Sequence, residues 1–167
     1  MEYLHCYHSP LGEIILSADE NAITGLCFAG QKHIAAISDK ASTEMHLPVF
    51  AMAEKWLGIY FSGNNPGFMP PIKTAGTAFQ ETVWQILPGI PYGKTMSYGE
   101  IAKIIAVQKG IAKMSAQAAG AAVAHNPIAL IIPCHRVIGK DGSLTGYAGG
   151  LHIKARLLEL EKASFNP

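Results

Sequence analysis

The sequence predicts an α/β protein of the α+β type in two parts, a small antiparallel sheet with a helix followed by a helical domain. Three observations support this prediction. The first thirty residues contain short Ile- and Leu-rich runs, an amphipathic stretch follows, and capped helix starts fill the second half. With 167 residues, 49% of them hydrophobic and 15% charged, the chain is long enough for two small cores.

The first thirty residues are typical of an antiparallel meander. The runs 3–8, 13–18 and 22–29 are strand-like, and a turn that contains Pro10 and Gly12 joins the first two runs. These features predict a three-stranded sheet.

The segment 48–61 repeats apolar residues three and four positions apart, which predicts an amphipathic helix. A stretch rich in Gly, Asn and Pro ends the helix, and an extended connector follows. We therefore expect two domains, residues 1–72 and residues 73–167.

Helix starts are well marked in the second domain. Thr77, Ser97 and Ser115 each precede a helical stretch as N-cap candidates, and Glu100 lies three residues after Ser97, as in a capping box. The helices expected are 78–87, 98–106, 116–124 and 151–163.

Two short helices followed by a hairpin around the turn 139–142 are typical of a helix-turn-helix with a wing. The small residues of 116–124 would let that helix approach DNA closely, but they equally fit tight packing in a core. The pattern leaves both alternatives open.

The chain carries no signal of a membrane or secreted protein. No apolar run approaches the roughly 20 residues that span a bilayer, and residues 1–10 lack the features of a signal peptide. Three cysteines, Cys6, Cys27 and Cys134, are an odd and sparse set, which favours a reducing compartment over a disulfide framework. We therefore expect a cytoplasmic protein.

The net charge of +1 is unevenly distributed. Residues 1–71 hold three lysines and seven acidic residues, whereas residues 72–167 hold ten Lys or Arg and five acidic residues. A basic second half favours a polyanionic partner, although many domains with such a charge bind no nucleic acid.

The stretch Pro133-Cys134-His135-Arg136 follows a short apolar run and is the candidate reactive centre. A cysteine is nucleophilic as the thiolate, which a nearby positive charge and a proton-accepting histidine both favour. A cysteine after an apolar run is also commonly an inert core thiol, so these residues alone do not decide between the two roles.

A zinc site near the N-terminus is the other chemistry to consider. The possible ligands are Cys6, Cys27, His5, His8 and His33. The Cys-x-x-Cys and His-x3-His spacings of structural zinc sites are absent, so we expect no metal and a packing role for both cysteines.

Six short motifs follow one another between residues 70 and 162. They are Gly76-Thr77-x-Phe79-Gln80-x-x-Val83-Trp84, Ile90-Pro91-Tyr92-Gly93-x-Thr95-x-Ser97-Tyr98-Gly99-Glu100-x-Ala102, Asn126-Pro127, Ile132-Pro133-Cys134-His135-Arg136-Val137-Ile138, Gly146-Tyr147-x-Gly149-Gly150 and Lys154-x-x-Leu157-Leu158-x-x-Glu161. Together they resemble the O6-alkylguanine-DNA alkyltransferases, or methylated-DNA–protein-cysteine methyltransferases. The first half matches more loosely, mainly in Ser9-Pro10-Leu11-Gly12 and Gly25-Leu26.

The resemblance implies a ribonuclease-H-like first domain and a winged-helix-like second domain that carries the active site. The implied activity is direct-reversal DNA repair, in which the alkyl group on guanine O6, or less readily thymine O4, moves irreversibly to the cysteine. Each molecule of such a suicide enzyme acts once, and no cofactor is needed. By resemblance, Cys134 is the nucleophile and methyl acceptor, His135 takes its proton through a water, and Glu161 orients His135.

The resemblance also implies that Asn126 braces the turn carrying the cysteine and that Tyr98 donates a hydrogen bond to the departing guanine. Substrate- and DNA-binding residues expected from it are Gln117, Tyr147, Ala148, Gly149, Arg136 and Ser97. The expected partner is double-stranded DNA with an alkylated base, bound through the minor groove by a monomer. The base must flip out of the duplex, and a side chain from 116–124 would fill the vacated space.

One position departs from the usual family pattern. The residue that fills the stack is commonly an arginine, but counting back from Asn126 places Gln117 there, and the stretch between Tyr98 and Gln117 is longer than usual. Glutamine can hydrogen-bond an orphaned cytosine but is uncharged and shorter than arginine. We expect Gln117 to intercalate, and a lysine of the longer connector to contact phosphates. The candidates are Lys103, Lys109 and Lys113.

Three other functions remain open from the sequence. A cysteine hydrolase would use Cys134, His135 and Glu161 on an acyl substrate, but it would need an oxyanion hole that nothing in the sequence marks. A sensor of alkylated DNA would not need the cysteine. A winged-helix regulator without chemistry would not need His135 and Glu161 to accompany it.

Overall fold

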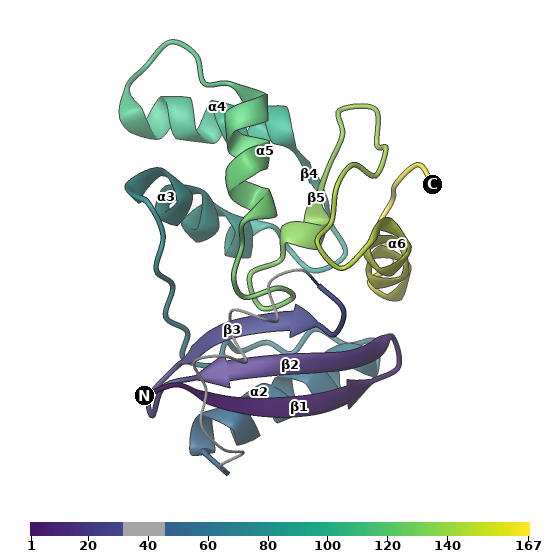
Figure 1. Cartoon of the computed structure of the whole chain (residues 1–167). Helices are drawn as coiled ribbons and strands as arrows, with labels where there is room; N and C mark the ends of the chain where they lie inside the picture. Colours follow the sequence, from purple (N-terminus) through teal and green to yellow (C-terminus); the bar gives the residue numbers. More distant parts are fainter. Residues whose placement is uncertain (32–45) are drawn as a thin grey trace. The chain divides into compact units, whose positions relative to one another are not determined.

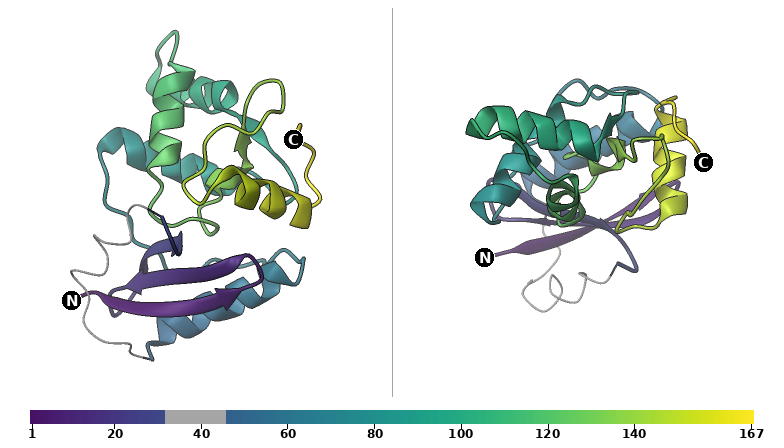
Figure 2. Two further views of the ribbon diagram at one scale, coloured as in Figure 1. Left: turned by 45° about the vertical axis from the view of Figure 1, so that its right-hand side comes forward. Right: turned by 90° about the horizontal axis from the view of Figure 1, so that it is seen from above.

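The computed structural model describes residues 1–31 and 46–167, which form two compact units (Figures 1 and 2). The first unit comprises Met1–Thr74 with Pro127–Ala129, and the second comprises Ala75–Asn126 with Leu130–Pro167. The division after Thr74 lies two residues beyond the domain boundary that we expected between residues 72 and 73. The return of residues 127–129 to the first unit was not foreseen. His33, weighed as a zinc ligand, lies outside the described residues.

The first unit contains a three-stranded antiparallel sheet in the order β1 (Tyr3–Ser9), β2 (Gly12–Ala18) and β3 (Ile23–Phe28). Helix α2 (Pro48–Phe61) covers one face of the sheet (Figure 1). His5 stacks on Phe50 of α2, and its cross-strand partner Leu16 is fully buried on the same face. The predicted meander and amphipathic helix are therefore present.

Residues 127–129 join this unit as a short addition to the edge of the sheet. The Leu26 amide of β3 donates to the Pro127 carbonyl at 3.0 Å, and the Ala129 amide donates to the Leu26 carbonyl at 3.1 Å. This parallel pairing joins residues a hundred positions apart in the sequence, which local sequence signals do not encode.

The second unit consists mainly of helices. They are α3 (Ala78–Ile86), α4 (Tyr98–Lys109), α5 (Ala116–Ala124) and α6 (Leu151–Leu160). Helix α5 packs against both α3 and α4, and the Trp84 indole of α3 donates to the Ala122 carbonyl of α5 at 2.9 Å (Figure 1).

The predicted helix starts are confirmed. The side chains of Thr77, Ser97 and Ser115 accept hydrogen bonds from backbone amides three residues later, and the first two form complete capping boxes. Helix α4 runs one turn beyond its expected end and stops at Gly110, whose φ of 64° is readily adopted by glycine. Part of the longer stretch between Tyr98 and Gln117 is therefore helix.

The expected hairpin at 139–142 is only partly correct. The Gly139 amide donates to the Ser143 carbonyl at 2.8 Å and closes a tight turn. However, β5 (Val137–Ile138) pairs in parallel with β4 (Met96–Ser97), and Ser143 bridges to Asn166. The expected wing is therefore a tight turn, and the residues on either side of it pair with segments that are distant in the sequence.

No helix among the described residues is long and apolar enough to cross a membrane.

We predict that Thr77→Ala lowers the free energy of unfolding by about 1 kcal/mol, because its hydroxyl caps the Gln80 amide at 3.1 Å. Thr82→Ala is the matched control, since the Thr82 hydroxyl bonds the Ala78 carbonyl of the same helix and caps no amide at the helix start. Urea denaturation followed by circular dichroism measures both. Equal effects of the two substitutions would contradict the capping role.

Candidate active site

Cys134 lies at the end of a buried apolar turn. Leu130, Ile131 and Ile132 are almost fully buried, and Leu130 has a φ of 68°, which is unusual for a residue with a bulky side chain. The Cys134 amide donates to the Ile132 carbonyl at 2.8 Å, and Cys134 begins the 3-10 helix Cys134–Arg136. The cysteine itself remains partly exposed.

The Asn126 side chain lies against this turn. Its amide donates to the Ile132 carbonyl at 2.8 Å, and it also forms a hydrogen bond with the Cys134 side chain. One amide thus contacts both the turn and the sulfur, in the place that the bracing role requires.

His135 and Glu161 form a buried pair. His135 Nε2 is 2.5 Å from Glu161 Oε2, and both side chains are 0% exposed. An ionised carboxylate only accepts hydrogen bonds, so Nε2 carries the proton of neutral His135 and Nδ1 carries the lone pair. The imidazole can therefore accept a proton only through Nδ1.

Two further groups bind Glu161. Arg136 Nε donates to Oε1 at 2.8 Å, and the Gly93 amide donates to the same oxygen at 3.0 Å. Arg136 also donates to the Ile90 carbonyl at 2.8 Å and is 8% exposed. Arg136 thus hydrogen-bonds to Glu161 and Ile90 inside the unit, and its expected role in binding substrate or DNA stays a prediction.

These contacts determine the charges of the pair. Burial alone would raise the pKa of Glu161, but hydrogen bonds from His135, Arg136 and Gly93 outweigh it and lower that pKa from 4.5 to about 2. Burial lowers the pKa of His135 below its ordinary value of 6.5, and Glu161 opposes this effect only in part. At neutral pH, Arg136 therefore balances the Glu161 charge while His135 is neutral.

The lowered pKa makes Glu161 a source of pH-dependent stability. A carboxyl group whose pKa is lower in the folded chain stabilises that state above its unfolded pKa. The stabilisation by Glu161 is thus complete above about pH 4.5 and is lost as the pH falls toward about 2.

Cys134 is a neutral thiol before substrate binds. Enclosure by surrounding atoms raises the pKa of Cys134 above its ordinary value of 9.0, although the Asn126 hydrogen bond and the Lys154 charge act in the opposite direction. The site therefore holds a protonated thiol together with a neutral imidazole. Its nucleophile forms only when the proton is transferred.

Tyr98 and Lys154 meet at one carbonyl. The Tyr98 hydroxyl donates to the Thr145 carbonyl at 2.8 Å, and Lys154 Nζ donates to the same oxygen and to the Gly146 carbonyl, each at 3.2 Å. Lys154 is 0% exposed, and burial lowers its pKa from 10.5 to about 8. These contacts hold the loop that leads to Tyr147.

No role for Lys154 was predicted from the sequence. A signal was nevertheless present, because Lys154 lies three and four positions before the buried Leu157 and Leu158, on the inner face of α6. A lysine on a buried helix face needs polar partners, which the two loop carbonyls supply.

The predicted pocket residues follow this loop. Burial raises the pKa of Tyr147 well above 10.0, and a charge on Cys134 raises it further, so its hydroxyl lies within electrostatic range of the sulfur. The Tyr147 hydroxyl is buried and has no hydrogen-bond partner among the described residues. Ala148 is exposed and Gly149 is half-buried.

Gln117 and Ser97 occupy the starts of two helices. Gln117 is exposed in the first turn of α5, whereas Ala119 and Ala122 of that helix are buried. The Ser97 hydroxyl caps α4 through the Glu100 amide at 3.1 Å. Lys103 and Lys109 are exposed residues of α4, and Lys113 is an exposed residue of the connector between α4 and α5.

In the described part of the chain, one group of three possible metal-ligating side chains comes together, Cys6, His8 and Glu13 of the first unit.

Both halves of the chain match models of one family. Residues 3–74 match the ribonuclease-like domain of 6-O-methylguanine DNA methyltransferase, and residues 78–163 match its DNA-binding domain. These matches cover nearly the whole chain.

Curated relatives match over almost their full length. The methylated-DNA–protein-cysteine methyltransferase of Methanosarcina acetivorans is 43% identical over 95% of this chain and 97% of its own. The constitutive enzyme of Bacillus subtilis is 38% identical over 99% of this chain and 98% of its own.

Solved structures agree with these matches. The O6-methylguanine methyltransferase of Mycobacterium tuberculosis superimposes with a TM-score of 0.85 at 41% identity, over 100% of this chain and 96% of that chain. The crystal structure of the same organism's OGT in complex with DNA superimposes with a TM-score of 0.83 at 40% identity, over 96% of this chain and 92% of that chain. The fold, the two matched domains and the full-length relatives show that this chain belongs to the 6-O-methylguanine DNA methyltransferase family.

Proposed function

We propose that this protein repairs DNA by direct reversal, moving the alkyl group from guanine O6, or from thymine O4, to Cys134 in a single turnover. The observation that carries the proposal is a cysteine, partly exposed as a residue, next to a buried histidine–carboxylate pair. A group-transfer protein that acts once needs a nucleophile and a base, and both are present.

The reaction begins with proton transfer. His135 accepts the Cys134 proton at Nδ1 through a bridging water, and Glu161 stabilises the imidazolium that forms. The sulfur then attacks the alkyl carbon, a C–S bond forms, and the electron pair of the C–O bond leaves with guanine. The stable thioether leaves Cys134 unable to react again.

Tyr98 assists the departing base. Its hydroxyl donates to the developing negative charge at guanine N3 and lowers the energy of the leaving group. In the absence of substrate this hydroxyl donates to the Thr145 carbonyl, so it must change acceptor. Lys154 also donates to that carbonyl, which therefore keeps a partner when Tyr98 turns to the base.

DNA binds through the exposed face of α5. Gln117 projects from the first turn of this helix, and the small exposed residues Ala121 and Ala124 continue the same helix. A narrow helix of this kind fits the minor groove, and Gln117 fills the stack after the alkylated base flips out. Tyr147, Ala148 and Gly149 then enclose the flipped base.

Other groups support the complex with DNA. Ser97 lies at the positive N-terminus of α4, where backbone amides favour a phosphate. The exposed lysines of α4 and the connector supply further phosphate contacts. Arg136 acts indirectly by holding Glu161.

We propose that the protein acts as a monomer in the cytoplasm, without a cofactor.

We predict that one methyl group is added per protein molecule after incubation with a duplex that contains one O6-methylguanine. Intact-protein mass spectrometry measures the gain, and Cys134→Ala should show none. Multiple turnover without a stable mass gain would indicate a hydrolase. Retention of the alkylated duplex with an unmodified Cys134 would indicate a lesion sensor.

We predict that Glu161→Gln slows methyl transfer by about 100-fold or more, because the neutral amide no longer stabilises the imidazolium of His135. Glu159→Gln is the matched control, since Glu159 is exposed on the same helix. Single-turnover rates are measured across pH, with melting curves to confirm that each variant is folded. Similar rate profiles for the two variants would exclude the proposed role of Glu161.

We predict that Gln117→Ala slows repair of duplex DNA by about tenfold, because the vacated stack is left unfilled at a cost of about 1.4 kcal/mol or more. Repair of the same lesion in a single strand, which requires less unstacking, should change little. Gln85→Ala, at an exposed position of α3, is the control. Duplex repair by Gln117→Ala at the parent rate would show that another group fills the stack.

A further inference from the structure

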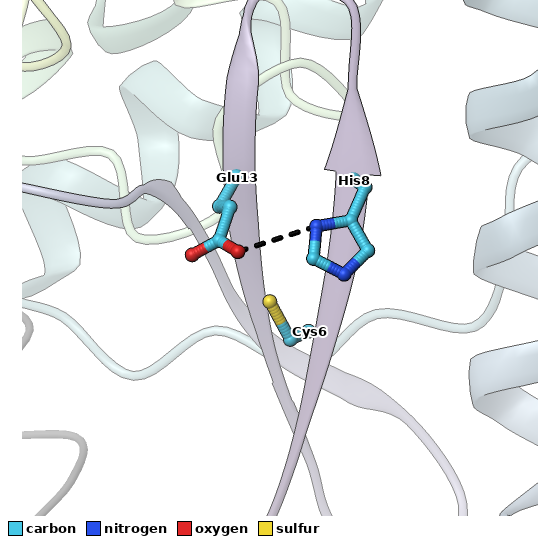
Figure 3. Close-up of side chains that lie close together, drawn as sticks. All are labelled: Cys6, His8 and Glu13. Carbon is cyan, nitrogen blue, oxygen red and sulfur yellow. Dashed lines mark ion pairs between the residues drawn. The ribbon is translucent and has the colours of Figure 1, made fainter.

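We infer that Cys6, His8 and Glu13 form a zinc-binding site on the β1–β2 hairpin (Figure 3). The site lies in the first unit and uses none of the residues assigned to alkyl transfer. The existence of this zinc site therefore does not depend on the proposed function.

Strand pairing brings the three side chains together. Cys6 and His8 are two residues apart in β1, so they project from the same face of the strand. Glu13 of β2 is the direct cross-strand partner of His8. Figure 3 shows the thiol, the imidazole and the carboxylate close together on the two strands.

The spacing of the ligand atoms suits a tetrahedral ion. All three lie within 4.8 Å of one another, and His8 Nδ1 is 3.2 Å from Glu13 Oε1. Zinc bonds of about 2.0–2.1 Å to nitrogen and oxygen place these two ligands about 3.3 Å apart at a tetrahedral angle. The imidazole and carboxylate already have this separation, and the Cys6 sulfur lies within 4.8 Å of both ligand atoms.

The ligand types favour zinc over harder cations. A thiolate with an imidazole is a poor set for magnesium or calcium, which prefer oxygen, whereas all three groups are ordinary zinc ligands. On binding, the Cys6 thiol releases its proton to solvent as the Zn–S bond forms. The thiolate and the Glu13 carboxylate then balance the charge of the dication.

The site is open to solvent. The side chains of His8 and Glu13 are 80% and 55% exposed, so an ion can reach them and keep a water as its fourth ligand. Without a metal, His8 and Glu13 form an exposed ion pair, which contributes little to stability. A bound ion would join β1 to β2 and raise the melting temperature of the protein.

Cobalt is a suitable probe because it occupies zinc sites and is coloured. We predict that the full-length, tag-free, reduced and metal-free protein binds one Co²⁺ per chain. The spectrum should show a thiolate-to-cobalt charge-transfer band and the intense visible bands of four-coordinate cobalt. Added Zn²⁺ should remove these bands and raise the melting temperature.

Variants identify the thiol and the other ligands. Cys6→Ser should abolish the charge-transfer band, whereas Cys134→Ala should retain it. His8→Ala and Glu13→Gln should each weaken cobalt binding by about tenfold or more, since losing a direct ligand costs at least as much as losing a group that supports one. His5→Ala is the matched control, because His5 lies on the opposite face of β1 and pairs with Glu54.

Three outcomes would overturn the inference. They are the absence of a charge-transfer band in the parent protein, persistence of the band in Cys6→Ser, and its loss in Cys134→Ala. Circular dichroism confirms that each variant is folded. Because Glu13 is exposed, Glu13→Gln tests the site even if Cys6→Ser fails to fold.

Discussion

The structure of the reactive centre depends on one buried carboxylate. Glu161, at the end of α6, accepts hydrogen bonds from His135, Arg136 and the Gly93 amide, and so links three segments far apart in the sequence. A buried carboxylate is tolerated only with such partners, because losing its hydration is costly. The same contacts fix the orientation of the imidazole. The joining of these segments and the orientation of the imidazole therefore depend on one electrostatic arrangement.

Features encoded locally were predicted well from the sequence. The caps at Thr77, Ser97 and Ser115 define their helices because the donor and acceptor lie three residues apart. The expected hairpin was partly wrong because β5 pairs with a strand some forty positions earlier, Met96–Ser97. The Arg136 and Gly93 contacts of Glu161 likewise depend on residues far apart in the sequence, which no local spacing reveals.

The two sequence interpretations of α5 prove compatible. Ala119 and Ala122 are buried because α3 and α4 pack closely on one side of the helix, and a Cβ atom at Gly120 would lie 3.3 Å from the Tyr98 ring. Small residues on the other side remain exposed around Gln117. One composition therefore serves internal packing and leaves a slender outer surface. Gln117, at the position where the resemblance predicts an arginine, belongs to that outer surface.

The raised pKa of Cys134 has a consequence for how long the protein stays usable. Oxidants and stray electrophiles in the cell attack thiolates far faster than thiols. A protein that reacts once cannot recover from a wasted encounter, so a permanently ionised cysteine would be consumed while waiting for damage. In the proposed mechanism the sulfur stays protonated until His135 accepts its proton, so the cysteine resists oxidants and stray electrophiles until substrate is bound.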